Sequence, residues 1–185
     1  TDAVVLSKGA DFWLMGPDST MIRSSVPVIA VTAVRTGVGK SQTTRKITKI
    51  LKERGKKVVV IRHPMPYGDL LKQRVQRFET LEDLDKHETT IEEREEYEPH
   101  IVEGFVVYAG VDYGAILEEA EKEADIILWD GGNNDLPFYY PDLLITLADP
   151  HRPGHETLFY PGEANVRTAD VVVLNKVDTA APEDV

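Results

Sequence analysis

The 185-residue chain contains no cysteine. Disulfides, thiolate-bound zinc and cysteine nucleophiles are therefore excluded, and a bound metal must take oxygen or imidazole ligands, which makes Mg²⁺ the natural candidate. No apolar run is long enough to cross a bilayer, and no charged-then-apolar leader opens the sequence. We therefore expect no membrane partner and a cytoplasmic location.

Positive charge is scarce, because 21 Lys and Arg residues face 32 Asp and Glu residues and give a formal net charge of -11. A nucleic-acid partner would require a basic face, so we expect none. Most of the excess lies in residues 79–98, where ten acidic residues accompany only Lys86 and Arg94. Most of these carboxylates are expected to face solvent on helices. Arg94 either forms a buried structural ion pair, the favoured reading, or contacts substrate.

Six apolar, β-branched runs recur along the chain: VPVIAVTAV, KKVVVIR, GFVVYAG, ADIILWD, DLLITLAD and ADVVVLNK. Because these runs are continuously apolar rather than alternating, they predict strands covered on both faces, as in a parallel sheet. The segment at 41–57 has Ile47, Ile50 and Leu51 at helical spacing and Gly55 at its end. The pattern predicts an α/β fold with a doubly wound, mostly parallel sheet, helices on both faces and ligands at the carboxyl ends of the strands.

The domain boundaries are read from the ends of this pattern. The chain begins with Thr1 and stops soon after the last apolar run, where a parallel sheet normally continues with a helix. We expect an excerpt of a longer protein. In this interpretation, residues 1–25 end an upstream domain or linker, and residues 26–185 form a nucleotide-binding domain truncated at its C-terminus.

The string AVRTGVGKS, residues 33–41, ends like a phosphate-binding loop of the form G-x-x-x-x-G-K-[ST]. In that motif backbone N–H groups surround phosphates, the lysine reaches the β and γ phosphates, and the hydroxyl binds Mg²⁺. Val34 stands where the first glycine belongs, so the loop either is one residue longer or turns without that glycine. The residues expected to bind nucleotide here are Thr36, Gly37, Val38, Gly39, Lys40, Ser41 and Gln42.

A phosphate loop needs a second metal anchor beside the Ser41 hydroxyl. Asp130 ends an apolar run and precedes two glycines that let backbone approach a γ phosphate. Asp69, in PYGDL, is the competing carboxylate.

The last apolar run ends in NKVD. In GTP-binding proteins the aspartate of an N-K-x-D motif accepts from guanine N1 and N2, and the asparagine faces the other edge of the base. Asn175, Lys176 and Asp178 are therefore candidate guanine contacts, with chance occurrence of a four-residue motif as the alternative.

Five longer strings follow the phosphate loop in order: RHPMPYGDL, TIEEREEYEPH, WDGGNNDLPFYYPDL, DPHRPGHE and PGEANVRTADVVVLNKVDTA. With the loop, they resemble the cyclic 2,3-diphosphoglycerate synthetase family of archaea and some bacteria. The resemblance implies a P-loop NTPase fold, as in dethiobiotin synthetase and nickel-insertion GTPases, and longer family members with an additional N-terminal domain. It implies ATP-driven closure of a phosphoanhydride within a small phosphorylated acid, 2,3-diphosphoglycerate, whereas NKVD suggests GTP.

Such a reaction needs cations around an anionic substrate. Arg62 and His63 end the second apolar run, and Arg152 and His155 follow DLLITLAD, so both pairs are candidate substrate contacts at one sheet edge. His100 and Arg167 are expected to be structural.

Arg35 stands four residues before Gly39, where ATPases of the Min and nitrogenase-reductase kind place a second lysine, often across a dimer interface. We therefore expect Arg35 to act as an arginine finger, beside Lys40 and Asp130 as catalytic residues, and a homodimer becomes possible. The alternative is a loop arginine that only raises the local potential.

Two other functions remain open. One is a regulatory or metallochaperone GTPase, although nickel-insertion GTPases carry histidine-rich or cysteine-bearing stretches, and this chain has five scattered histidines and no cysteine. The other is a kinase for another small phosphorylated acid, which only substrate turnover can distinguish.

Overall fold

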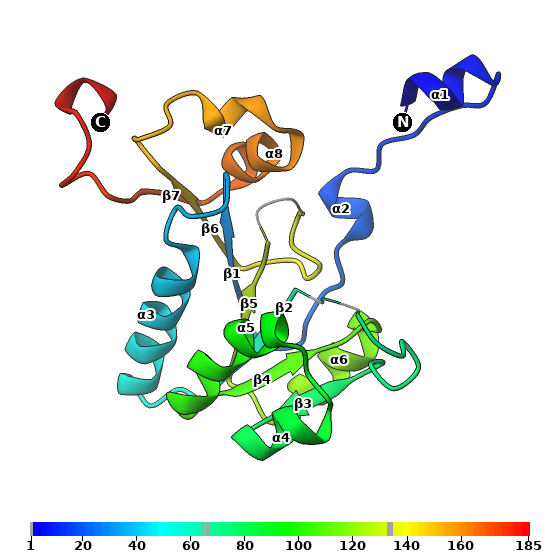
Figure 1. Cartoon of the computed structure of the whole chain (residues 1–185), viewed down its shortest axis with the longest axis vertical. Coiled ribbons are helices and arrows are strands. Elements are labelled where there is room, and N and C mark those ends of the chain that lie inside the picture. Colours follow the sequence, from blue (N-terminus) through cyan, green and yellow to red (C-terminus); the bar gives the residue numbers. More distant parts are fainter. Residues whose placement is uncertain (1, 64, 66, 133–134) are drawn as a thin grey trace.

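The computed structural model describes residues 2–63, 65, 67–132 and 135–185. Within these ranges a seven-stranded sheet has the order β3-β4-β2-β5-β1-β6-β7 (Figure 1). The strands are β1 (Val28–Ala33), β2 (Val58–Arg62), β3 (Gln76–Phe78), β4 (Val106–Ala109), β5 (Ile126–Asp130), β6 (Leu143–Ala148) and β7 (Val171–Leu174). The helices are α1 (Asp2–Ser7), α2 (Pro17–Thr20), α3 (Lys40–Glu53), α4 (Leu81–Lys86), α5 (Ile91–Val102), α6 (Tyr113–Ala120), α7 (His155–Leu158), α8 (Tyr160–Thr168) and the 3₁₀ turn η1 (Pro182–Asp184).

The predicted parallel sheet is confirmed. The six apolar runs form β1, β2, β4, β5, β6 and β7, and each of these pairs in parallel with its neighbours among them. The sequence analysis missed β3, which is antiparallel to β4 at the sheet edge. Its three residues, Gln-Arg-Phe, contain no apolar run and owe their strand form to pairing with β4.

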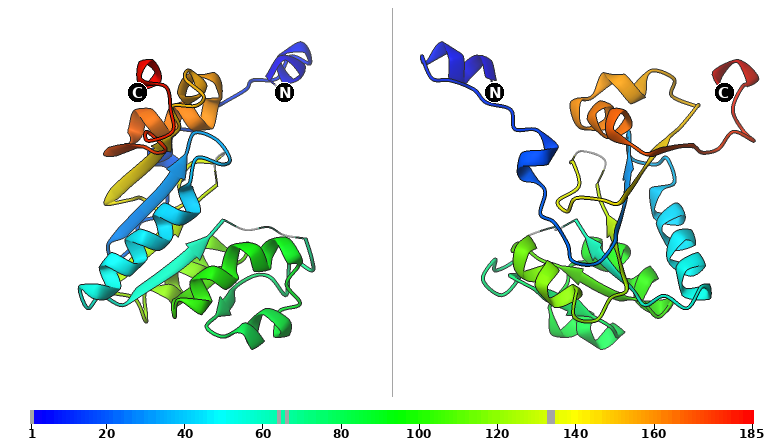
Figure 2. Two further views of the ribbon diagram at one scale, coloured as in Figure 1. Left: turned by 60° about the vertical axis from the view of Figure 1, so that its left-hand side comes forward. Right: turned by 180° about the vertical axis from the view of Figure 1, so that it is seen from behind.

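Helices cover both faces of the sheet, as the sequence predicts (Figure 2). On one face, α3, α4 and α5 pack on strand residues such as Val60 and Leu128, with Tyr97 of α5 fully buried between them. On the other, Ile116 and Leu117 of α6 pack near Trp129. Parallel strands are covered on both sides because each crossover helix must bury its apolar stripe.

The end of α3 follows its predicted signal. Gly55 has a φ of 73°, and its N–H donates to the carbonyl of Lys52 at 2.9 Å. This left-handed conformation favours glycine, so Gly55 ends the helix and turns the chain toward β2.

Residues 2–25 contain α1 and α2 and lead away from the sheet toward the N-terminus (Figures 1 and 2). They approach the rest of the chain through a bridge between Ile22 and Tyr139 and through the Glu121 carboxylate, which accepts from Ser24 Oγ and Ser25 N. The proposed division at residue 25 stays a prediction. Among the described residues, no helix combines the length and apolar character needed to cross a membrane.

Candidate functional site

The site forms where the carboxyl ends of three neighbouring strands meet. In the sheet register, Asp130 at the end of β5 lies beside Val31 of β1 and Arg62 of β2. The phosphate loop leaves β1 at the same edge. Strand order therefore brings together residues from separate parts of the sequence, as expected for a ligand site in a doubly wound sheet.

The phosphate loop turns without its first glycine. Val34 is buried and continues the strand, because its N–H donates to the carbonyl of Leu147 at 3.0 Å. The turn falls later, at Gly37 and Gly39, whose φ angles of 85° and 97° are left-handed. A side chain is therefore tolerated at position 34, and the glycines are used where the backbone reverses.

A cleft of about 800 Å³ opens over this loop. It gathers twelve of the residues that the sequence singled out: Arg35, Thr36, Gly37, Gly39, Lys40, Ser41, Gln42, Arg62, His63, Asp130, Asn175 and Lys176. The cleft is therefore the site that best fits a nucleotide and its reaction partner.

Five predicted residues do not line the cleft. Val38 is buried beneath the loop, and Asp178 is exposed in the turn after β7. Asp69 accepts from the backbone N–H of Leu71 at 3.0 Å in an exposed turn, so Asp130 is the carboxylate beside the phosphate loop.

Arg152 and His155 lie in the loop after β6 and at the start of α7, outside the cleft lining. Arg152 is exposed, and the His155 ring lies 5.8 Å from that of Phe159. The sequence placed both residues at the correct edge of the sheet, but neither of them lines the cleft.

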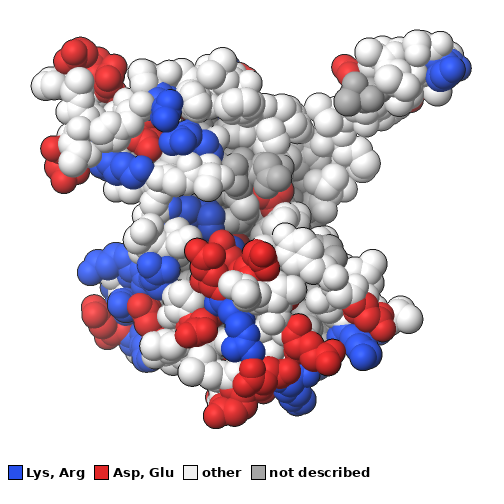
Figure 3. Space-filling view, in the orientation of Figure 1, with Lys and Arg blue, Asp and Glu red and all other residues white. Residues whose placement is uncertain are grey.

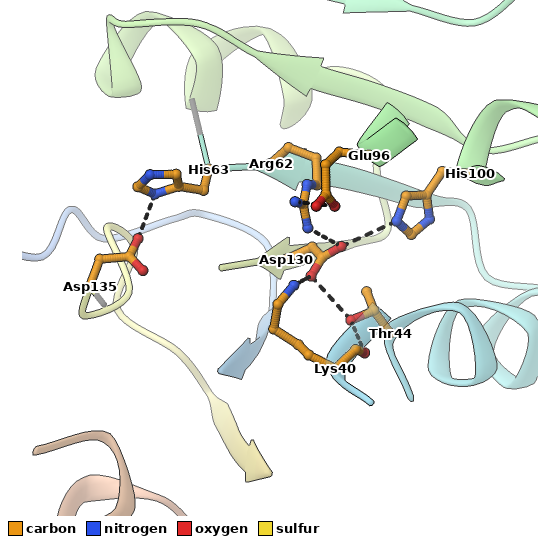
Figure 4. A network of polar contacts seen from close by, with 8 residues as sticks. All are labelled: Lys40, Thr44, Arg62, His63, Glu96, His100, Asp130 and Asp135. Carbon is orange, nitrogen blue, oxygen red and sulfur yellow. Dashed lines mark hydrogen bonds and ion pairs between the residues drawn. The ribbon is translucent and has the colours of Figure 1, made fainter. Parts of the chain in front are cut away.

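Asp130 is the centre of the polar network (Figure 4). Its Oδ1 accepts from Lys40 Nζ at 2.5 Å and from Thr44 Oγ1 at 3.2 Å. Its Oδ2 lies 2.5 Å from Arg62 Nη1 and 3.3 Å from His100 Nε2. The carboxylate is 1% exposed, so four elements enclose it: β5, α3, β2 and α5.

The network keeps Asp130 ionised. Burial alone raises the pKa of this carboxyl, but the charges of Arg62 and Lys40 and the hydrogen bond with His100 hold it well below its usual range. The pKa of Arg62 is raised, because Asp130 and Glu96 outweigh its burial. A buried carboxylate with two cationic partners is thus a fixed charge beside the phosphate loop.

Helix α5 forms one wall of the cleft. Its residues Glu95, Glu96 and His100 line the cleft and are called the α5 wall below. Glu96 Oε2 contacts Arg62 Nη2 at 2.5 Å. The sequence analysis missed Glu95 and Glu96, together with Arg45 of α3 and Met65.

The acidic segment behaves only partly as expected. Most of its carboxylates are exposed, but Glu93 is 2% exposed and closes a capping box with Thr90 at the start of α5. Arg94 pairs with Asp85 as the favoured reading expects, but the pair is not buried, because the side chain of Asp85 is 76% exposed. His100 is buried and contacts Asp130 Oδ2 from the cleft wall, and its expected structural role stays a prediction.

Arg167 forms a surface ion pair with Glu163 one helical turn away, in agreement with a structural role. On the opposite side of the network, His63 Nδ1 lies 2.6 Å from Asp135 Oδ2. The Asp135 carbonyl accepts from the amide of buried Asn165 at 2.8 Å. This contact fixes the β5–β6 loop against the end of β2.

The first two residues of NKVD bind the phosphate loop itself. Asn175 Nδ2 donates to the carbonyl of Val38 at 2.7 Å, and Lys176 Nζ donates to that of Gly37 at 2.5 Å. Lys176 Nζ also contacts Asp149, whose carboxylate lies 3.4 Å from Arg35 Nη1. The motif therefore fixes the loop conformation and the position of Arg35.

Gly131 follows Asp130 with no room for a side chain. A Cβ atom at this position would lie 1.8 Å from the ring of Trp129. Trp129 is fully buried and packs edge-on against Phe138. Close packing therefore requires glycine directly after Asp130.

No family model matches the chain, but comparison with known proteins finds a similar protein sequence and similar solved structures. The chain is 72% identical over 179 residues to a protein of Thermococcus kodakarensis named arginine synthetase ArcE. The match covers 97% of this chain but 40% of that protein. The crystal structure of LpxK from Aquifex aeolicus in complex with ATP has a TM-score of 0.63, with 17% identity over 96% of this chain and 54% of that one.

The structural similarity concerns the fold, and it agrees with the strand order and the loop geometry described above. The parallel sheet, the phosphate loop between β1 and α3 and the aspartate at the end of the neighbouring strand occur together. This chain therefore has the α/β fold of the P-loop NTPases.

Proposed function

We propose that the intact protein is a nucleotide-dependent synthetase that activates an acceptor oxygen by phosphoryl transfer. The observation that carries the proposal is the convergence of Lys40, Arg62 and Asp130 on one cleft above the phosphate loop. Phosphoryl transfer requires positioning and positive charge near the γ phosphate rather than covalent chemistry from the protein. The name of the 72% identical protein, a synthetase, supports the same class of reaction.

The phosphate loop is the proposed nucleotide site, with Mg²⁺ beside it. The Ser41 hydroxyl and the Asp130 carboxylate fit this ion, because both are hard oxygen ligands of the kind Mg²⁺ prefers. Mg²⁺ would be held by these two groups and by phosphate oxygens, and it would neutralise charge on the transferring group. Asp69, exposed and outside the cleft, is the weaker candidate.

The proposed nucleotide is ATP, as the resemblance to the cyclic 2,3-diphosphoglycerate synthetases implies. NKVD keeps GTP open as the alternative, although the structure uses Asn175 and Lys176 to hold the phosphate loop and leaves Asp178 exposed. Competition between ATP and GTP for the wild type and Asp178→Asn decides this point. ATP preference unchanged by the substitution supports ATP, and a GTP preference lost with Asp178 would favour GTP.

For the acceptor, we propose a ureido compound that is converted to arginine. The guanidinium carbon of arginine is bonded to three nitrogens, so making it from a ureido group removes one oxygen. Transfer of the γ phosphoryl group to that oxygen breaks the bond to the β,γ-bridging oxygen and releases ADP. Ammonia then forms the new C–N bond, the C–O bond breaks, and the phosphate leaves as hydrogen phosphate with the one proton that the attacking nitrogen loses.

The second candidate acceptor is 2,3-diphosphoglycerate. The longer strings that resemble its cyclising synthetases favour it. Both acceptors use the same first step, in which a phosphoryl group is transferred to an oxygen. They differ in the group that displaces it, a nitrogen in one case and a second phosphate in the other.

The experiment offers both acceptors to the intact protein. Protein, Mg²⁺ and ATP are incubated with citrulline and ammonium or with 2,3-diphosphoglycerate, and the products are followed by chromatography of amino acids and by phosphorus NMR. Arginine formed in step with ADP supports the proposal, and Lys40→Ala protein is the control for contaminating activity. Formation of the cyclic anhydride without arginine would replace the acceptor, and nucleotide hydrolysis indifferent to both would favour the GTPase class.

A further inference from the structure

The α5 wall differs in charge from the rest of the cleft. Its two carboxylates, Glu95 and Glu96, face the same cleft as Lys40 and Asp130. Figure 3 shows acidic side chains gathered on this face of the molecule, with basic ones nearby. The acceptor must lie close enough to the γ phosphate to receive the phosphoryl group, and contacts through Arg62 and Asp130 join this wall to Lys40 of the phosphate loop.

The cations nearest the wall are already neutralised. Arg62 contacts Glu96 at 2.5 Å and Asp130 at 2.5 Å, and Lys40 contacts the same aspartate at 2.5 Å. Two positive side chains thus stand against two negative ones, and Glu95 adds a further negative charge. A bisphosphate carries several negative charges, and at this wall both neighbouring cations, Lys40 and Arg62, already form ion pairs.

The other basic residues of the cleft lie beside the phosphate loop. Arg45 belongs to α3, which begins at the phosphate loop, and Lys176 donates to the loop carbonyl of Gly37. Their position suits the triphosphate and not a second anionic substrate. The charge of the cleft is therefore divided between a nucleotide end and a wall that fits a neutral or cationic group.

The contacts of Arg62 indicate which chemical group suits the carboxylates beside the α5 wall. Its guanidinium, 6% exposed, lies between the carboxylates of Glu96 and Asp130. The two carboxylates contact the planar guanidinium through its terminal nitrogens. The buried Nε of Arg62 has no hydrogen-bond partner, so this donor stays unsatisfied. Carboxylates recognise such planar groups through paired N–H···O contacts. A ureido or guanidinium group of a substrate offers N–H donors of the same kind.

The side chain of Glu96 is 36% exposed, so it has open surface beside its contact with Arg62 (Figure 4). We infer that Glu96 is the specificity-determining residue of the acceptor subsite, where its carboxylate accepts N–H groups of the ureido substrate and of the arginine product. Glu95, exposed at the same wall, favours positively charged substrates through its field. This inference rests on the proposed function and names the substrate class of the same site.

The test measures KM separately for each substrate in the intact protein. Glu96→Gln keeps the size of the side chain and removes its charge. We expect the KM for citrulline to rise at least tenfold, which corresponds to about 1.4 kcal/mol, while the KM for ATP changes less than about twofold. Glu92→Gln is the matched control, because Glu92 is exposed on the same helix and does not line the cleft.

A binding measurement without turnover gives a second result. Titration calorimetry of arginine into protein saturated with ADP should show weaker binding in Glu96→Gln and unchanged binding in Glu92→Gln. Glu96→Asp should restore part of the affinity, because it returns the charge on a shorter stem. If Glu96→Gln does not fold, Glu95→Gln replaces it, with an expected rise of about two- to threefold in the KM for citrulline.

The outcomes separate the inference from the proposed function. Arginine synthesis by the wild type together with an unchanged KM for citrulline in the variants overturns the inference alone. Equal rises in both KM values also overturn it, because Glu96 would then act only by holding Arg62. Cyclic anhydride without arginine from the wild type overturns both.

Discussion

Two carboxylates of this chain, Asp130 and Glu123, form ion pairs with arginine but lie in different surroundings. Asp130 lies at the carboxyl edge of the sheet between Lys40 and Arg62. Glu123 lies after α6 and accepts from Arg77 Nε and Nη2, both at 2.8 Å. Both carboxyls have a lowered pKa, that of Glu123 at about 2 because of the hydrogen bonds from Arg77, so the pKa alone does not distinguish them.

The surroundings distinguish the two. Glu123 forms a bidentate pair with Arg77 of β3 and accepts from the Tyr108 hydroxyl at 2.7 Å, so its oxygens are satisfied and it fastens the antiparallel edge strand. Asp130 lies in the wall of the cleft with its carboxylate 1% exposed, and its partner Arg62 keeps a buried Nε without an acceptor. In this chain, a lowered carboxyl pKa therefore indicates a candidate functional site only where the surrounding hydrogen-bond network has an unsatisfied donor and borders the cleft.

The largest effect is expected from the cleft network. Lys40→Ala should reduce nucleotide turnover by at least about a hundredfold, because the lysine is a phosphate ligand in the transition state. Its melting temperature should fall less than that of Asp130→Asn, because Asp130 keeps Arg62 as its counter-charge. Steady-state kinetics and thermal unfolding measure both, with Lys46→Ala, exposed on the same helix, as the control. A folded Lys40→Ala protein with normal turnover would remove the functional role of this network.

Asp130→Asn should affect both stability and metal dependence. It leaves Lys40 and Arg62 without their buried counter-charge, at a cost of about 3 kcal/mol in the free energy of unfolding. Nucleotide binding in the presence of Mg²⁺ should weaken more than binding without it. Denaturant unfolding and nucleotide titrations measure the two effects. The same pattern in Asp69→Asn instead would transfer the metal role to Asp69.

Arg35→Ala tests the expected arginine finger. Loss of a transition-state contact should lower kcat by about tenfold with little change in the KM for nucleotide, and Arg35→Lys should recover only part of the rate. A kcat within about twofold of the wild-type value would contradict the arginine finger, and the ion pair with Asp149 would then be the role of Arg35. Mixing Lys40→Ala with Arg35→Ala protein tests a homodimer, because activity returns only if the arginine acts across an interface.

The smallest effect is expected from the structural carboxylate. Glu123→Gln should lower stability by about 1 kcal/mol near neutral pH and leave turnover unchanged. Because the pKa of Glu123 is lowered from 4.5 to about 2 in the folded protein, its contribution is complete above about pH 4.5 and is lost as the pH falls toward 2. Unfolding curves across this range should show less acid sensitivity in the variant. Impaired turnover in Glu123→Gln would contradict the division between the two carboxylates.

The nucleotide half of the cleft could be predicted from the sequence because its signals are local. The loop residues are contiguous, and Asp130 ends an apolar run that reads as a strand. The wall that α5 adds to the cleft could not, since Glu95, Glu96 and His100 lie in a segment where nearly every other residue is acidic, and their selection depends on the rotation of α5 above the sheet. The sequence placed Arg152 at the correct edge of the sheet, but the residues around it do not predict the path of its loop.

The packing of Gly131 against the Trp129 ring restricts how this region can change. A methyl group at position 131 would displace an indole buried on the face of the sheet that α6 covers, so the restriction comes from the core and acts without nucleotide. A library randomised at residues 131 and 132 and selected only for folded protein should therefore return glycine at 131, while position 132 varies. Retention of glycine after the aspartate in such a selection is evidence about packing, and it cannot be used as evidence for phosphate binding.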